Sequence, residues 1–327
     1  MTSHLYHGIE EVAGSTPLVR LPRWEAAHGL KNIKVYAKLE SFNPGGSAKD
    51  RTAAALVKDA KESGRLKPGT MVVESSSGNL GIALARQAIL EDFDFHCVVD
   101  PRTNQSTLGM IRAYGGTLHP VTEPDPETQD WLTARKNKVQ ELLREHPEAI
   151  NLDQYSNRAA FSAHSSGTMA EIFAALGHAP SRVYVAVSTT GTVGGCIAEV
   201  TARGVATEVI AVDAEGSVLY GGERGERLLP GYGAGMVTEL SRQQTPSSTR
   251  RVSAIDAVRQ ARALGQTEAI APGASGGAVM AALLADLPSL KAGEEVVVIL
   301  HDGGMPYTNT IYSNEWVREN LHVDLES

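Results

Sequence analysis

The feature that most constrains the fold of this chain is a regular alternation of short apolar runs with longer helical patterns. Runs with the length and pattern of strands occur at residues 34–40, 70–74, 94–99, 117–121, 182–187, 208–213 and 295–300. Helical patterns fall near residues 48–63, 79–90, 104–114, 127–145, 159–176, 192–203, 256–264 and 276–286. Alternation of this kind predicts an α/β protein, with mainly parallel sheets covered by helices on both faces.

The length of the chain, 327 residues, suits two domains of ordinary size. Residues 151–155 lead from one α/β block into the next. We therefore expect an N-terminal domain over residues 1–155 and a C-terminal domain over residues 156–327. Boundaries predicted in this way are good only to several residues.

Composition and charge exclude several classes of function. A net charge of −8 argues against a nucleic-acid-binding protein. Cys97 and Cys196 lie in apolar or glycine-rich runs without a partner at metal-ligand spacing, which predicts buried free thiols in a reducing compartment and no metal site. The N-terminus has no apolar signal-peptide region, and the longest apolar run, residues 296–300, is too short to span a bilayer. We expect a cytoplasmic protein with no membrane partner.

One loop places a lysine at the start of a helix. After the strand at 34–40, Pro44 and its neighbouring glycines predict a turn. Ser47 is a suitable helix N-cap, and Asp50 three residues later completes a capping box. Lys49 would then lie in the first helical turn, where the positive end of the helix dipole lowers the pKa of its amine. A lysine in this setting suits a Schiff base, although an exposed lysine balanced by Asp50 would give the same pattern.

Two further strand-to-helix loops are rich in hydroxyls. The loop after strand 70–74 carries no basic residue, so its hydroxyls and backbone N–H groups favour a small carboxylate; it contains Ser76, Ser77, Gly78 and Asn79. The loop after strand 182–187 can hold one phosphate dianion, and it contains Ser188, Thr189, Thr190, Gly191 and Thr192. A nucleotide P-loop is excluded there because the required lysine is absent. The alternatives are a serine-rich N-cap and a polar turn.

Two glycine-rich segments invite other interpretations. Residues 231–235 read Gly-x-Gly-x-Gly, which is the wrong spacing for a dinucleotide fingerprint. Residues 273–277 read Gly-x-Ser-x-Gly, the pattern of a hydrolase nucleophile elbow at Ser275. A triad would need Asp286 with His301 or His322, but only about fifty residues remain to complete such a sheet. A serine hydrolase is therefore a minor alternative.

Together these loops resemble those of fold type II pyridoxal-phosphate (PLP) enzymes of the cysteine synthase family. The run Asn-Pro-Gly-Gly-Ser-Ala-Lys-Asp-Arg at residues 43–51 is similar to the family's cofactor-lysine motif. The resemblance implies a tryptophan synthase β-like fold of two three-layer domains. It also implies a homodimer and PLP held by Lys49 as an internal aldimine, with this lysine as the base for the α-proton.

The same resemblance assigns the other site residues. Asn79 would bind the cofactor's ring hydroxyl, and the loop at 188–192 its phosphate. Gly231 would lie against the ring. Substrate would contact Ser76, Ser77, Gly78, Asn79 and Gln154. The family's serine for the pyridine nitrogen falls at Ala274 by our alignment, so Ser275, one residue later, would need a shifted turn to take this role.

Several segments are similar to one branch of the family, the siderophore-pathway N-(2-amino-2-carboxyethyl)-L-glutamate synthases. They include residues 74–85, 97–101, 211–217 and 229–231, and Leu80 stands where cysteine synthases usually have threonine. This implies replacement of the phosphate of O-phospho-L-serine by L-glutamate, on the way to 2,3-diaminopropionate in siderophore or antibiotic biosynthesis. The run at residues 304–307 departs from the family's Gly-acid-Arg-Tyr.

The alternatives are an O-acetylserine or O-phosphoserine sulfhydrylase and a non-catalytic α/β binding protein. Both proposed substrates of the branch are anionic and need cations. The candidates are Arg51, Arg102, Arg112, Arg224 and Arg227.

Overall fold

Two sheets organise the computed structural model, which describes residues 5–76 and 78–325. The larger has the strand order β1 (Leu18–Arg20), β2 (Lys34–Leu39), β9 (Glu295–Leu300), β6 (Arg182–Ala186), β7 (Glu208–Ala214) and β8 (Ser248–Val252). Every neighbouring pair in it is parallel except β1 with β2. The smaller sheet is parallel, in the order β3 (Met71–Ser75), β4 (Asp94–Val99) and β5 (Thr117–Pro120).

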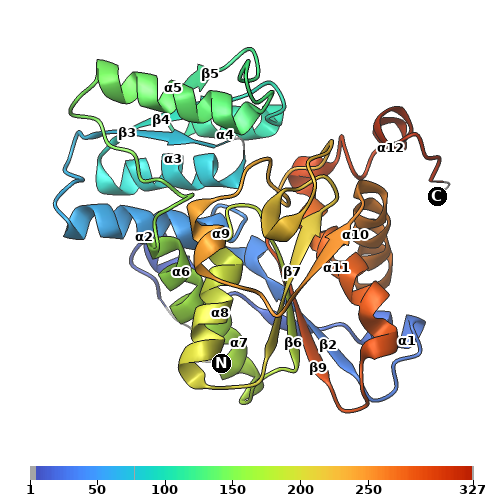
Figure 1. Ribbon diagram of the computed structural model, residues 1–327. Helices are drawn as coiled ribbons and strands as arrows, with labels where there is room; N and C mark the ends of the chain where they lie inside the picture. Colours follow the sequence, from blue (N-terminus) through green and yellow to red (C-terminus); the bar gives the residue numbers. More distant parts are fainter. Residues whose placement is uncertain (1–4, 77, 326–327) are drawn as a thin grey trace.

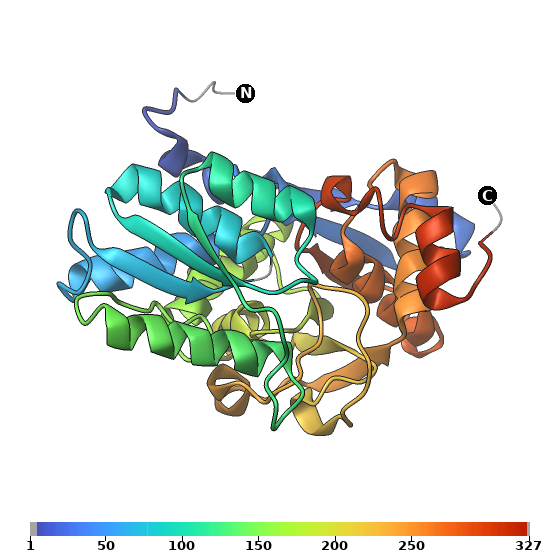
Figure 2. The same cartoon turned by 90° about the horizontal axis from the view of Figure 1, so that it is seen from above.

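Helices cover both faces of each sheet (Figures 1 and 2). On the larger sheet, α1 (Pro22–Ala27), α10 (Ala254–Glu268), α11 (Ala274–Asp286) and α12 (Asn314–Leu321) pack on one face, and α7 (Ala170–Leu176) and α8 (Gly191–Arg203) on the other. On the smaller sheet, α2 (Lys49–Glu62), α3 (Asn79–Glu91) and α4 (Gln105–Ala113) lie opposite α5 (Trp131–Glu145). Two short helices complete the set, α6 (Ala159–Ala163) and α9 (Glu239–Gln243).

The alternation of side chains along β9 shows how the layers form. Val296 and Val298 belong to the core beneath α10 and α11, whereas Val297 and Ile299 belong to the core beneath α7 and α8. Successive side chains of a strand point to opposite faces, so a strand covered on both sides must be apolar throughout. The predicted α/β class with mainly parallel sheets is confirmed.

The predicted strands are all present, but some elements were not predicted. β1 has three residues and β8 is a polar edge strand, so neither has a clear apolar pattern. The short helices α1 and α9 and the C-terminal α12 were also missed. These segments take their structure from pairing and packing more than from their own periodicity.

The two sheets do not divide the chain at residue 155. β1 and β2 precede that residue but belong to the larger sheet, in which β2 pairs with β9 from Lys34↔Glu295 to Leu39↔Leu300. Parallel pairing of strands far apart in sequence buries β2 on both faces, which local patterns cannot reveal. The strands of the smaller sheet lie within residues 71–120, and the strands at residues 18–39 belong with the C-terminal strands. None of the described helices is both long and apolar enough to cross a bilayer.

Candidate active site

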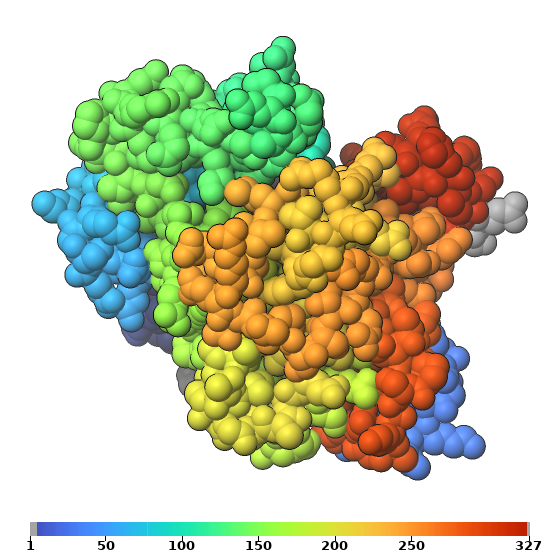
Figure 3. All heavy atoms as spheres, in the orientation of Figure 1, coloured from blue at the N-terminus to red at the C-terminus, as the bar shows by residue number. Residues whose placement is uncertain are grey.

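A pocket of about 270 Å³ collects the loops that the sequence analysis singled out. Lys49 enters it from the first position of α2, and Asn79 from the first position of α3. Thr189 enters it from the loop after β6, and Ser275 from the start of α11. The carboxyl ends of parallel strands are where open α/β sheets bind ligands. The lining comes from both sheets, whose units form neighbouring lobes in Figure 3.

Lys49 carries the only lysine amine in this lining among the described residues. Its Nζ donates to Thr189 Oγ1 at 3.2 Å and to Gln154 Oε1 at 3.4 Å. Burial lowers the pKa of Lys49 to about 8, and the negative charge of Glu74 opposes this shift. The direction agrees with the sequence analysis, but burial is the main cause, rather than the expected helix dipole.

The predicted capping box takes a different form. Ala48 is the N-cap of α2, and Ser47 Oγ accepts from the N–H of Lys49 at 3.2 Å. The carboxylate of Asp50 accepts from the Gly45 N–H at 3.0 Å and pairs with Arg86. Asp50 therefore fastens the preceding turn and helix α3, and it is not available as a counter-ion for Lys49.

The lowered pKa of Lys49 predicts a characteristic pH profile. Only a free, neutral amine reacts with an acylating reagent, so in protein stripped of any bound cofactor we expect modification of Lys49 to rise with pH and reach half its maximum near pH 8. Competitive labelling with acetic anhydride, followed by peptide mass spectrometry, measures this rate for every lysine at once. A profile for Lys49 that still rises steeply above pH 10 would contradict the burial of its amine.

The hydroxyl-rich loop at 188–192 contributes unequally to the pocket. Ser188, Thr189 and Thr192 line it. Thr190 has a left-handed backbone (φ 70°) and turns its Oγ1 toward the Thr189 carbonyl at 2.7 Å. Gly191 starts the thirteen-residue α8, whose N-terminal N–H groups suit an anion. Neither Thr190 nor Gly191 is among the lining residues.

Some polar groups of the loop after β3 form hydrogen bonds within the loop and to the start of α3. Ser76 Oγ accepts from the Gly81 N–H at 2.9 Å, so this hydroxyl caps α3. Gly78 and Asn79 line the pocket with Ser76, and Gln154 joins them through a bond from its Nε2 to the Ser75 carbonyl at 2.9 Å. Ser77 lies outside the described residues.

Asp302 and Tyr307 are pocket residues that the sequence analysis did not identify. Asp302 Oδ2 accepts from Asn79 Nδ2 at 2.8 Å and from the Tyr307 hydroxyl at 2.6 Å. Burial raises the pKa of the Asp302 carboxyl, against the effect of these two hydrogen bonds. An acid directly after a predicted strand was the available signal, because strand ends carry sites in parallel sheets.

The structure distinguishes between Ala274 and Ser275. Ser275 lines the pocket, whereas Ala274 packs in the core of the larger sheet. Gly231 faces it, with a left-handed φ of +92°, and a Cβ built there would lie 3.6 Å from Ser275 Cβ. Ser275 and Gly231 therefore lie next to each other in the pocket, and the contact of Ser275 with the pyridine nitrogen stays a prediction.

The hydrolase alternative finds no support in these contacts. Asp286 accepts from the Tyr184 hydroxyl and from Arg250, each at 2.8 Å. The ring nitrogens of His301 are buried and have no hydrogen-bond partner among the described residues. Ser275, His301 and Asp286 are thus not connected as a triad.

Three arginines line the pocket, Arg102 and Arg135 from the unit of the smaller sheet and Arg227 from the segment after β7 of the larger one. Arg135, which was not a candidate from sequence, is 5% exposed. Its Nε lies 3.2 Å from Asp100 Oδ2, and its Nη1 has no hydrogen-bond partner among the described residues. A buried guanidinium with an open donor is suited to an anion. Arg112 and Arg224 do not line the pocket.

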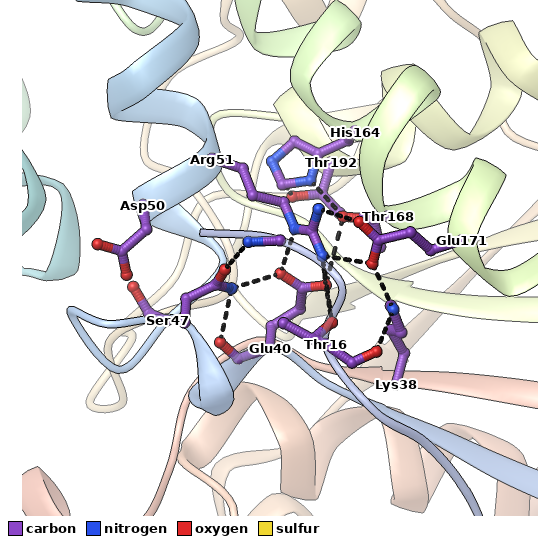
Figure 4. A network of polar contacts seen from close by, with 12 residues as sticks. Thr16, Lys38, Glu40, Ser47, Asp50, Arg51, His164, Thr168, Glu171 and Thr192 are labelled. Carbon is purple, nitrogen blue, oxygen red and sulfur yellow. Dashed lines mark hydrogen bonds and ion pairs between the residues drawn. The ribbon is translucent and has the colours of Figure 1, made fainter. Parts of the chain in front are cut away.

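Arg51 belongs to a buried ion-pair network behind the lysine loop (Figure 4). Its Nε donates to Glu40 at 2.8 Å, and its two terminal nitrogens donate to Glu171 at 2.7 Å. Lys38, 1% exposed, donates to Glu171 at 2.6 Å. Arg51 therefore fastens the first turn of α2 to the turn that follows β2 and to α7, and it is not a substrate-binding cation.

Known proteins are similar to most of this chain. The family model described as pyridoxal-phosphate dependent enzyme matches residues 9–302. A curated relative, N-(2-amino-2-carboxyethyl)-L-glutamate synthase of Ralstonia nicotianae, is 36% identical over 309 residues, covering 94% of this chain and 90% of the relative.

Solved structures superpose on nearly the whole chain. O-ureido-L-serine synthase does so with a TM-score of 0.86 at 30% identity, over 99% of this chain and 98% of its own. The O-acetylserine dependent cystathionine beta-synthase from Helicobacter pylori has a TM-score of 0.88 at 26% identity, over 95% and 100% respectively.

Proposed function

Because the chain belongs to the family of pyridoxal-phosphate dependent enzymes, we propose that it catalyses replacement of the phosphate of O-phospho-L-serine by L-glutamate. The products are N-(2-amino-2-carboxyethyl)-L-glutamate and phosphate, and the pathway leads to 2,3-diaminopropionate. The predicted family, fold type II architecture and cofactor are confirmed. The choice of substrates is our proposal, and the observation that carries it is the open donor of Arg135 in an arginine-lined pocket.

The residues of the pocket fit PLP. Lys49 offers an amine of lowered pKa to its aldehyde. Ser188, Thr189 and Thr192, with the backbone of Thr190 and Gly191 at the start of α8, are suited to its phosphate. Gly231 leaves room for the flat ring, and the neutral hydroxyl of Ser275 suits the pyridine nitrogen. When bound, PLP supplies an electron sink for reactions at the substrate Cα.

We assign proton transfer and substrate binding to residues of the pocket. We assign Lys49 as the base that takes the α-proton of the serine substrate, since its neutral form is accessible near neutral pH. Gly78, Asn79 and Gln154, with Ser76, are assigned to the substrate α-carboxylate and the cofactor's ring hydroxyl. Asp302 holds the Asn79 amide in place through its 2.8 Å hydrogen bond.

Arg135 is assigned to an anionic group of the substrate. We expect Arg135→Gln to lower kcat/KM for O-phosphoserine about tenfold to a hundredfold, because a charge-assisted hydrogen bond contributes about 1.5–3 kcal/mol. Turnover of O-acetylserine, which lacks the phosphate, should change much less. Steady-state kinetics with both substrates measures the ratio, and equal losses for the two would contradict a phosphate contact.

A competition experiment tests the choice of nucleophile. O-phosphoserine is supplied with glutamate and sulfide together, and the products are identified by mass spectrometry. We expect the glutamate adduct to form. Cysteine as the only product would favour a sulfhydrylase, the second candidate, which the solved O-acetylserine dependent neighbour suggests. A non-catalytic binding protein would form neither.

We further propose that the enzyme is a cytoplasmic homodimer. Support comes from the family resemblance and from the composition, with two free buried cysteines. Light scattering of the purified protein measures the mass directly: a value near twice the 34.7 kDa of the chain is expected, and a single-chain mass would contradict the dimer.

A further inference from the structure

His164 lies between helix α2, which begins at Lys49, and the hydroxyl-rich loop at residues 188–192, called the phosphate loop below. It starts the π-helical turn η3 (His164–Met169) between α6 and α7, and it is 1% exposed. Its Nε2 lies 3.1 Å from Thr52 Oγ1 and 3.3 Å from Thr192 Oγ1, and its Nδ1 lies 2.9 Å from Thr168 Oγ1. Thr52 belongs to α2, one turn beyond Lys49. Thr192 belongs to the first turn of α8 and lies beside His164 in Figure 4.

The surroundings of His164 determine where its proton lies. Burial, followed by the charges of Arg51, His301 and Lys49, lowers the pKa of His164 well below its ordinary value, so the ring is neutral. Thr168 Oγ1 donates to Glu40 Oε1 at 3.4 Å. Its hydrogen is then directed to Glu40, and the hydroxyl oxygen accepts from the Nδ1–H of His164.

Nε2 is therefore left as an acceptor that faces two hydroxyls. Each of Thr52 and Thr192 can only donate to it, which fixes the directions of both O–H bonds. A π-helical turn inserts one residue into a helix and reorients the side chain there, which is why such turns recur at functional sites. In this protein the π-helical turn directs the ring of His164 toward the first turns of α2 and α8.

We propose that His164, as the Nδ1–H tautomer, is a positioning residue. It links the hydroxyl of Thr192, in the phosphate loop, to the hydroxyl of Thr52 on α2. This link fixes the position of the phosphate loop relative to Lys49, although α2 and α8 pack on different sheets. The proposal rests on the phosphate site proposed at residues 188–192, but not on the identity of the amino-acid substrates.

Two substitutions separate this role from a purely structural one. His164→Gln can place an amide oxygen near the position of Nε2, whereas His164→Asn reaches only the position of Nδ1. We expect His164→Asn to weaken PLP binding about tenfold, the effect of one hydrogen bond to a charged group, and His164→Gln to stay within about threefold of the parent. His178→Asn, at an exposed histidine that pairs with Glu295, is the matched control.

The measurement uses the full-length protein and does not depend on turnover. PLP affinity is obtained from the quenching of protein fluorescence, and ³¹P NMR of the bound cofactor reports the environment of its phosphate. His164→Asn should shift the ³¹P signal, and in a Thr192→Val background it should add little further loss of affinity. Parental affinity and ³¹P signal for His164→Asn, or fully additive losses, would overturn the proposal.

The tautomer gives a second test that needs no variant. ¹⁵N NMR of the histidine-labelled parent protein should show a protonated Nδ1 and an unprotonated Nε2 for His164. The opposite tautomer would overturn the proposal even if both variants failed to fold. Failure of glutamate addition in the competition experiment would leave these results unaffected, so the two proposals fail separately.

Discussion

Replacing Lys49 with alanine is expected to abolish the visible absorbance of the purified protein and to reduce turnover of O-phosphoserine by about 10³-fold or more. The reason is that the described lining of the pocket contains no other lysine amine. The variant should remain folded, because alanine is a good helix former at the first position of α2. Absorbance spectra and product formation measure the two effects.

Lys58→Ala is the matched control for this variant. Lys58 lies on the same helix, is 74% exposed in its side chain, and only approaches Glu62 at 3.7 Å. Its loss should leave absorbance and turnover unchanged. Visible absorbance and turnover that survive in the Lys49→Ala protein would contradict the assignment of Lys49.

Replacing Arg51 with methionine is expected to lower the free energy of unfolding by about 3–5 kcal/mol, because the change leaves a buried charge without its partner. Glu40 is fully buried and takes two hydrogen bonds from Arg51, at 2.8 and 3.1 Å. Lys38 pairs with Glu171, so no second ion pair to Glu40 is present in the described residues. Urea unfolding monitored by circular dichroism measures the loss.

Two further variants sharpen this prediction. Arg51→Lys should recover only part of the stability, since an ammonium cannot bridge two carboxylates with a planar fork of donors. Lys58→Ala again provides the control, because an exposed pair on a helix contributes about 0.5 kcal/mol or less. An unfolding midpoint for Arg51→Met equal to that of the Lys58 control would refute the structural importance of the network.

The alternation of strands and helices predicted the fold class because the central strands are mostly apolar on both faces. The same signal could not place β2 in the larger sheet, since the pairing partner β9 lies more than two hundred residues away. Edge strands such as β8 were also not predicted, because a half-exposed strand can carry Thr and Arg without losing stability. Sheet membership is a property of tertiary pairing, and periodicity reports only local structure.

Much of the candidate site was predicted because its residues follow strands that the local sequence pattern reveals. Lys49, Asn79 and Thr189 follow strand ends, where turn residues and hydroxyls are visible in the sequence. Arg135 and His164 lie within helical patterns, where a charged or polar residue is usually a solvated one. Their burial, and the contact of His164 with Thr52 and Thr192, depend on helices that meet only in the folded protein.

The central claim is that the amine of Lys49 forms the covalent bond to the cofactor. Borohydride reduction of the purified protein makes this bond permanent, and digestion followed by mass spectrometry identifies the modified peptide. We predict one pyridoxyl-phosphate group per chain, on the peptide that contains Lys49. A group attached to any other lysine, or an unmodified Lys49 peptide from a yellow protein, would contradict the account.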